Sequence, residues 1–176
     1  TEEDWSEWMR RFAVELLRES PDPALRVCAA VAQAYPVLAR DLFNASFVLC
    51  WTRLSDEDCT QLVKSLKFVL RHSKTPPDVL HVLLNLAEFM EHNNRALPIQ
   101  IRQLAEYSIR CHAYAKALHY KELEFLVNPS ACVDDLISIN NRLDQNEAAA
   151  GLLRVVQQSS DTLMTRSSGS SGGGAG

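Results

Sequence analysis

The chain has 176 residues, of which 47% are hydrophobic and 23% are charged, so its length and apolar content suffice for a continuous core. With a formal net charge of −4, it has no basic field to attract a nucleic-acid backbone or an anionic bilayer. Its apolar runs are shorter than the roughly 20 residues of a membrane span and no leader signature opens it, so we expect a cytosolic protein.

Helices are predicted throughout, because Gly151 is the one glycine before the tail and prolines separate the apolar-periodic segments. The first helix has an apolar stripe at spacings of three and four, formed by Trp5, Trp8, Met9, Phe12 and Leu16. Three acidic residues, Glu2, Glu3 and Asp4, favour its positive N-terminal end, and steering of a basic partner is their alternative role. Asp22 followed by Pro23 predicts the cap and first residue of a second helix, which extends through Ala34.

The third segment starts at Pro36 and extends from Val37 to about Leu54, with apolar residues on nearly all sides. This pattern predicts one inner helix. Ser55 resembles the first residue of a capping box, with Asp58 in the place of the usual Glu or Gln. The helix that follows has one apolar stripe, so its other side should face water.

Two further helices are apolar on more than one side. The first contains the run LLNLAEFMEH (83–92), after the break Thr75-Pro76-Pro77, and the second contains YAKALHYKELEF (114–125). Between them, Pro98 predicts the start of a helix that ends near Cys111. Because exposing a second apolar face is unfavourable, we expect neighbouring helices to cover both sides of each run. The residues predicted to pack between successive helices are Leu84, Leu86, Phe89, Tyr114, Ala117, Leu118, Tyr120 and Phe125.

An amphipathic helix follows Asn128-Pro129-Ser130, and a last helix is predicted from Glu147 to about Gln157. About nine helices with short connections fit an all-α fold, an α-solenoid of stacked antiparallel helix pairs similar to tetratricopeptide (TPR) or HEAT repeats. We therefore predict a helical-repeat segment over 1–157. Residues 158–176 end in a run of Ser, Gly and Ala, which predicts a flexible loop or linker.

No catalytic, cofactor-binding or metal-binding motif is found. The glycines of a phosphate-binding loop are missing before the tail, and no HRD or DFG triplet occurs. His112 and His119 are seven residues apart, about 10 Å along a helix, which is too far for both to hold one zinc ion. The five cysteines are scattered without a CxxC pair, so we interpret them as reduced core thiols. Three tryptophans, Trp5, Trp8 and Trp51, are interpreted as core residues, with a role as interface anchors as the alternative.

Six collinear blocks resemble one protein family: TEEDWSEWMRR, ARDLFNASFV, LLNLAEFMEH, YAKALHYKELEF, LISINNRL and EAAAGLL. They are similar to the N-terminal part of the FAT region in the target-of-rapamycin (TOR) kinases, which are PI3K-related serine/threonine kinases. The Ser/Gly tail does not match this pattern. The resemblance implies a FAT-type solenoid of TPR-like helix pairs that clamps the kinase domain of the same polypeptide.

The resemblance also implies partners and a place in the cell. Expected partners are the kinase domain and neighbouring solenoid of the same chain, a Rheb-type small GTPase and other subunits of the TOR complexes. On the polar side of the first helix, the candidate partner-facing residues are Glu7, Arg10 and Arg11. A cytoplasmic location, peripheral to the lysosome, the vacuole or other endomembranes through the parent complex, is implied as well.

Two functions from different classes follow. The leading hypothesis is a non-catalytic scaffold and regulatory segment of a TOR-like kinase in nutrient and growth signalling, which relays partner binding to the catalytic cleft. The alternative is a stand-alone TPR/HEAT-like adaptor that binds a partner protein. A small enzyme of unknown chemistry ranks third.

Overall fold

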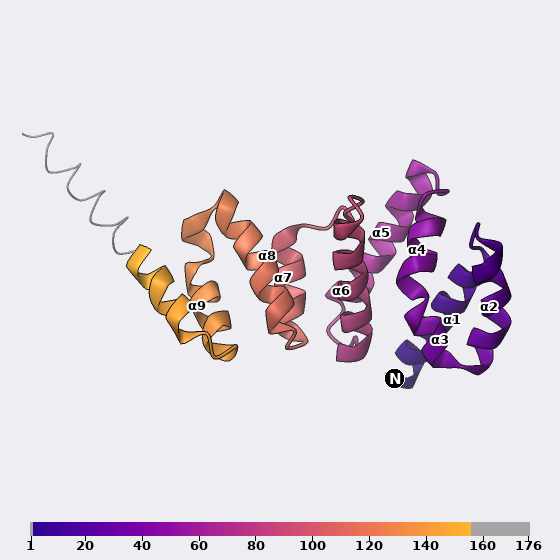
Figure 1. Ribbon diagram of the computed structural model, residues 1–176, viewed down its shortest axis with the longest axis horizontal. Helices are drawn as coiled ribbons and strands as arrows, with labels where there is room; N and C mark the ends of the chain where they lie inside the picture. The colour runs from indigo at the N-terminus through magenta and orange to yellow at the C-terminus, as the bar shows by residue number, and fades with distance from the viewer. Residues whose placement is uncertain (1, 156–176) are drawn as a thin grey trace, which may run out of the picture. The chain divides into compact units, whose positions relative to one another are not determined.

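The computed structural model describes residues 2–155, and over this range the fold is all-α with no strand. Within each unit the helices pack as pairs, in agreement with the predicted all-α fold of stacked helix pairs (Figure 1). The chain divides into two compact units, unit 1 (Thr1–Ala113) and unit 2 (Tyr114–Gly176). The predicted boundary at residue 157 and the predicted tail over 158–176 lie outside the described residues.

In chain order the helices are α1 (Glu2–Arg18), α2 (Pro23–Ala34), α3 (Pro36–Asp41), α4 (Phe43–Trp51), α5 (Asp56–Arg71), α6 (Pro77–His92), α7 (Ile101–Arg110), α8 (Tyr114–Val127), a short 3₁₀ helix η1 (Pro129–Ala131) and α9 (Val133–Arg142).

Local capping signals set the ends of several helices in unit 1. The Asp22 carboxylate accepts a hydrogen bond from the Ala24 amide at 2.8 Å, and α2 begins at Pro23 as predicted. The Ser55 hydroxyl oxygen accepts from the Asp58 amide at 3.2 Å and opens α5. These helix starts were predicted correctly because each depends on residues within a few positions of the cap.

The segment predicted as a single helix over 37–54 is instead two helices. α3 and α4 meet at Leu42, whose amide bonds back to the carbonyls of Arg40 and Leu38. Both pieces contact α1, and the turn between them buries Ala39 and Phe43 at 2% and 1% exposure. The prediction of one continuous helix was therefore wrong, because packing of both pieces on α1 requires a change of direction that periodicity does not reveal.

The helix α6 is the centre of unit 1. It contacts α1, α4, α5 and α7, so neighbours cover it on more than one side (Figure 1). Seven of its apolar side chains are buried: Val79, Leu80, Leu83, Leu84, Leu86, Ala87 and Met90. The prediction of an inner helix is confirmed here.

The connection between α6 and α7 is longer than predicted. α7 begins at Ile101 rather than at Pro98, and Leu97 and Ile99 of the linker are each buried at 7% exposure. Arg110 at the end of α7 donates hydrogen bonds to the carbonyls of Leu70 and Arg71, the last two residues of α5. This guanidinium satisfies carbonyls that the end of a helix leaves without intrahelical partners.

Unit 2 is built around α8 and α9, which contact each other and η1. Helical structure resumes over residues 146–155, and Ala149 in it is 4% exposed. A groove of about 570 Å³ is bordered by α8, α9 and this last stretch, including Ala148 and Leu152. Within the described residues, no helix of either unit has both the length and the hydropathy that crossing a membrane would require.

Candidate protein-interaction site

A groove of about 590 Å³ lies in unit 1 where α1, α3, the start of α4 and the first turns of α6 meet. Its walls are mainly apolar and come from residues of all four helices: Met9, Ala13, Pro36, Ala39, Phe43, Val79 and Val82. Ala13 and Ala39 are small side chains between larger ones, so they leave space where a longer side chain would fill it. The groove can therefore receive an apolar side chain of a partner.

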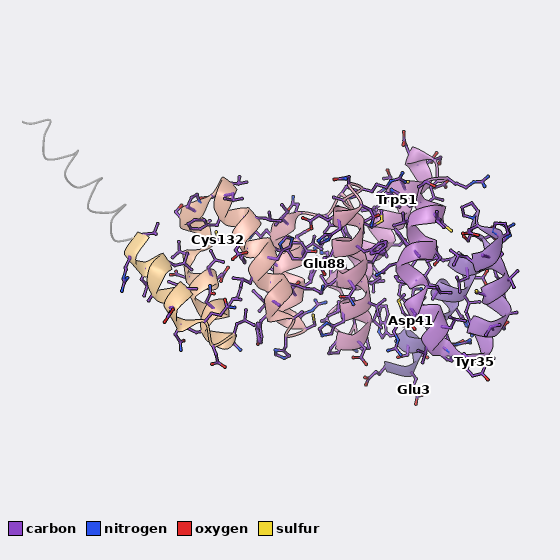
Figure 2. The ribbon with its side chains drawn as sticks, in the orientation of Figure 1. Glu3, Tyr35, Asp41, Trp51, Glu88 and Cys132 are labelled. Atoms are coloured by element: carbon purple, nitrogen blue, oxygen red, sulfur yellow. The ribbon has the colours of Figure 1, made fainter. Side chains whose placement is uncertain are left out.

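Charged groups line the same groove, and they come from three different elements. Glu3, Glu7 and Arg10 belong to α1, Arg40 belongs to α3, and Asp78 belongs to α6. Figure 2 shows Glu3 at the N-terminal end of α1. A groove with an apolar wall and charges of both signs has the chemistry of a protein-binding site, where apolar contact gives affinity and charge gives orientation.

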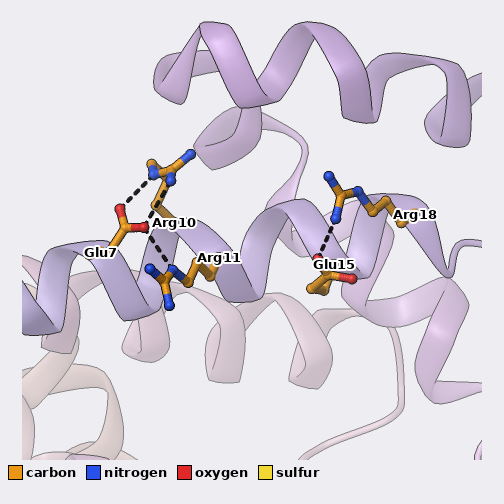
Figure 3. Close-up of polar contacts among 5 residues, drawn as sticks. All are labelled: Glu7, Arg10, Arg11, Glu15 and Arg18. Carbon is orange, nitrogen blue, oxygen red and sulfur yellow. Dashed lines mark hydrogen bonds and ion pairs between the residues drawn. The ribbon is translucent and has the colours of Figure 1, made fainter.

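Glu7 and Arg10 of this groove form, together with the neighbouring Arg11, the Glu7 cluster (Glu7, Arg10 and Arg11), shown in Figure 3. Arg10 donates to Glu7 from Nε at 2.7 Å and from Nη2 at 2.9 Å, and Arg11 Nε donates to Glu7 Oε1 at 2.7 Å. The hydrogen bonds from Arg10 and Arg11 lower the pKa of Glu7 to about 2 from 4.5, and the Glu7 carboxylate raises the pKa of Arg10. The cluster is thus a preformed arrangement of one carboxylate and two guanidinium groups.

The structure separates the three candidate partner-facing residues. Glu7 and Arg10 line the groove, whereas Arg11 does not and is 74% exposed. Glu15 and Arg18 form a second pair at 2.7 Å further along α1 (Figure 3). A partner seated in the groove would therefore meet Glu7 and Arg10 directly, while Arg11 holds Glu7 in place from outside.

No family model matches the chain, but individual proteins do. The TOR serine/threonine kinase of Arabidopsis thaliana is 50% identical over 175 residues, which is 95% of this chain. The TOR2 kinase of Saccharomyces cerevisiae is 49% identical over 90% of the chain, and the mTor kinase of Drosophila melanogaster is 46% identical over 93%. This chain is homologous to one segment of the TOR serine/threonine kinases. It spans 7%, 6% and 7% of those three proteins respectively.

The residues predicted to pack between helices take different positions in this TOR-homologous segment. Leu84, Leu86 and Ala117 are fully buried and Tyr120 is 1% exposed. Tyr114, Leu118 and Phe125 are half-buried. Phe89 is 37% exposed, so it lies at the border of the α6 core rather than within it.

Sequence reasoning missed Lys121, which is 3% exposed in α8. Its Nζ lies 2.8 Å from Glu124 Oε2 and 2.7 Å from Asp135 Oδ2, so it joins α8 to α9. Burial lowers the pKa of Lys121, but hydrogen bonds to Asp135 and Glu124 and their negative charges outweigh that effect and raise it above its usual value. The local signal was a lysine with a glutamate three residues later, but nothing in that spacing indicates Asp135.

Neither a metal site nor a reactive thiol is indicated by the residues that the structure describes. Within residues 2–155, no group of three His, Cys, Asp or Glu side chains is arranged to hold a metal ion. None of the five cysteines forms a disulfide, and burial is the main cause that raises the pKa of Cys50, Cys59 and Cys132. A raised pKa keeps these thiols protonated and poorly nucleophilic.

Proposed function

We propose that this chain is a non-catalytic scaffold and regulatory segment of a TOR-like serine/threonine kinase, the first part of its FAT-type solenoid. The observation that carries the proposal is the match to TOR kinases over nine tenths of this chain, together with a fold made of packed helix pairs. A segment that makes up 7% of its relatives and has a single glycine, Gly151, before its tail is poorly suited to cradle ATP phosphates. In this role it clamps the kinase domain of the same polypeptide, in the cytoplasm or at endomembranes to which the parent complex is recruited.

The groove on α1 supports the second half of the proposal, the relay of partner binding. Residues of α1, α3, α4 and α6 all border this groove, so an occupant would change the packing of several helices at once. A Rheb-type small GTPase or another subunit of the TOR complexes is the partner class proposed for it. The stand-alone adaptor is the weaker alternative, because the match to one kinase family gives it no separate support.

The scaffold role is tested in the full-length kinase that contains this segment. Leu86→Asp should lower phosphorylation of a protein substrate by at least about tenfold, because a buried unpaired charge disrupts α6. Asn85→Asp makes a matched charge change at an exposed position of the same helix and should leave phosphorylation unchanged. Equal activity of the Leu86→Asp enzyme and the unmodified kinase would contradict the scaffold role.

Two further observations separate this role from the alternatives. The isolated chain should hydrolyse no ATP above a blank, since hydrolysis would indicate an enzyme. The coding sequence downstream of this segment should encode a glycine-rich loop and the kinase triplets, whereas an adaptor would lack them.

The proposed relay of partner binding is tested by a separate binding measurement. Arg10→Glu in the full-length kinase should weaken binding of a GTP-loaded Rheb-type GTPase more than Arg11→Glu does, because only Arg10 lines the groove. Equal effects of the two substitutions would show that the groove does not receive this partner.

A further inference from the structure

A second surface of unit 1, on α5, has a different chemistry from the groove on α1. We define the α5 cationic stripe as Lys64, Lys67 and Arg71, which are spaced by three and four residues and therefore share one side of the helix. Phe68 lies within this stripe and is 65% exposed. Three cations therefore lie around one exposed aromatic ring, although the chain as a whole has a net charge of −4.

Phe68 stands between two grooves. The first, of about 510 Å³, is lined by Trp5, Trp8, Lys64, Ser65, Phe68 and Val69. The second, of about 460 Å³, is lined by Lys64, Lys67, Phe68, Arg71 and His72. Among residues 2–155, no carboxylate lines either groove, and both grooves combine aromatic walls with cationic groups.

Aromatic contacts connect the α5 cationic stripe to α1. The rings of Trp5 and His72 lie 5.4 Å apart and those of Phe68 and His72 lie 5.9 Å apart, measured between centroids. Trp5 and Trp8 are half-buried and meet edge to face at 6.1 Å. The grooves are therefore supported by packed rings from two helices rather than by one flexible side chain.

The cations of the stripe have no acidic partner in the part of the chain that the structure describes. Arg10, Arg11, Arg18, Arg102 and Lys121 each form an ion pair with a carboxylate, whereas Lys64, Lys67 and Arg71 form none there. Lys67 and Arg71 are four residues apart, a like-charge spacing that destabilises a helix. An acidic ligand would relieve this repulsion.

We propose that the α5 cationic stripe binds an acidic protein segment that carries an aromatic or aliphatic side chain. Its carboxylates pair with Lys64, Lys67 and Arg71, while its apolar side chain packs against Phe68 in the groove that Trp5 and Trp8 border. A long polyanion such as nucleic acid is disfavoured, because the same helix opens with Asp56, Glu57 and Asp58 and would repel it. This inference does not depend on the proposed function, since it concerns a different surface and a different ligand.

The test uses the 176-residue chain and a fluorescein-labelled peptide with six glutamates around one phenylalanine and two leucines. Binding is followed by fluorescence anisotropy at low salt. Lys64→Glu combined with Arg71→Glu should raise Kd by at least about tenfold, because two of the three pairing cations then carry the same charge as the peptide and only Lys67 remains to pair with it. Phe68→Ala should raise Kd by roughly threefold or more through loss of the apolar contact.

Matched controls separate a specific site from general electrostatics. Arg53→Glu combined with Arg95→Glu makes the same change in net charge at two exposed positions away from the stripe and should leave Kd within about twofold. A second peptide, with glutamine in place of each glutamate, should bind at least about tenfold more weakly. Circular dichroism of every variant should match that of the unmodified chain, since all the substituted side chains are exposed.

Three outcomes would overturn the proposal. The first is equal binding of the glutamate and glutamine peptides, and the second is equal loss in the control double variant. The third is binding of vesicles of phosphatidylserine and phosphatidylcholine, lost in Lys64→Glu with Arg71→Glu, in the absence of any peptide binding. The last result would assign the stripe to a lipid surface instead.

Discussion

The helices α6 of unit 1 and α8 of unit 2 have similar sequence patterns but are held in different ways. α6 buries seven apolar side chains among four neighbouring helices. α8 buries Ala117 and Tyr120 together with the charged Lys121, and its links to α9 include the ion pair between Lys121 and Asp135 and a hydrogen bond from Arg142 to the Tyr114 hydroxyl at 2.8 Å. Apolar residues on several sides of a helix therefore do not determine whether its contacts are apolar or polar.

This difference predicts unequal responses to substitution in the two helices. The largest effect is expected for Leu86→Asp in α6, which would place an unpaired carboxylate in a fully buried position. The loss should exceed about 4 kcal/mol, a large part of the stability of an ordinary domain, so the chain should lose its folded core. Circular dichroism during thermal unfolding measures it, with Asn85→Asp as the control. A soluble Leu86→Asp chain with unchanged helicity and Tm would contradict the assignment of α6 as an inner helix.

In α8 the corresponding experiment removes a charge. Lys121→Gln should destabilise unit 2 by about 2 kcal/mol, because Glu124 and Asp135 lose their shared cation. The effect stays below that of a fully buried pair because the Asp135 side chain is 52% exposed. Hydrogen exchange of the α9 amides measures it within unit 2, and Lys74→Gln at an exposed position is the control.

The pH dependence of the same contact follows from the raised pKa of Lys121. Its stabilising contribution is fully present below the unfolded pKa of 10.5 and is lost as the pH rises through the higher folded value. Protection of the α9 amides that stays constant up to and beyond that range would contradict a structural role for this lysine.

A smaller effect is expected for the second link between α8 and α9. Tyr114→Phe removes the hydroxyl that accepts from Arg142 but retains the ring, which lies 5.2 Å from the guanidinium carbon. The expected loss is about 0.5 to 1 kcal/mol in the free energy of local unfolding. Tyr35→Phe is the matched control because Tyr35 is 67% exposed at the corner between α2 and α3 (Figure 2). A loss of similar size in both variants would show that the hydrogen bond to the Tyr114 hydroxyl does not stabilise the contact between α8 and α9.

The smallest effect concerns the Glu7 cluster on the surface of unit 1. Glu7 should titrate at about 2 in the unmodified chain, and in a double variant Arg10→Gln with Arg11→Gln its pKa should return toward 4.5. Because the folded pKa is lowered, the contribution of the cluster is present above 4.5 and is lost as the pH falls through about 2. Carbon-detected NMR titration of the Glu7 carboxyl measures both values. An unmodified chain in which Glu7 titrates near 4.5 would show that the cluster does not persist in solution.

The sequence by itself determined which segments are helical and where several of them begin. Asp22, Ser55 and the proline pair at 76–77 act on backbone groups within a few residues, so their effects can be read without knowing the rest of the fold. The inner position of α6 was also predictable, because apolar residues on two faces must be covered by something. Of the candidate site, the sequence indicated the polar side of α1 with Glu7 and Arg10 but not the groove beside them.

Only the tertiary structure decided which face of each helix is buried and which neighbour it packs against. The turn at Leu42, the burial of Lys121 against Asp135 and the partial exposure of Phe89 all depend on residues far away in the sequence. The groove on α1 likewise requires side chains from four helices to meet. Periodicity states which residues share a side of one helix, whereas the identity of the neighbour and its charge depend on contacts between helices that local spacing does not encode.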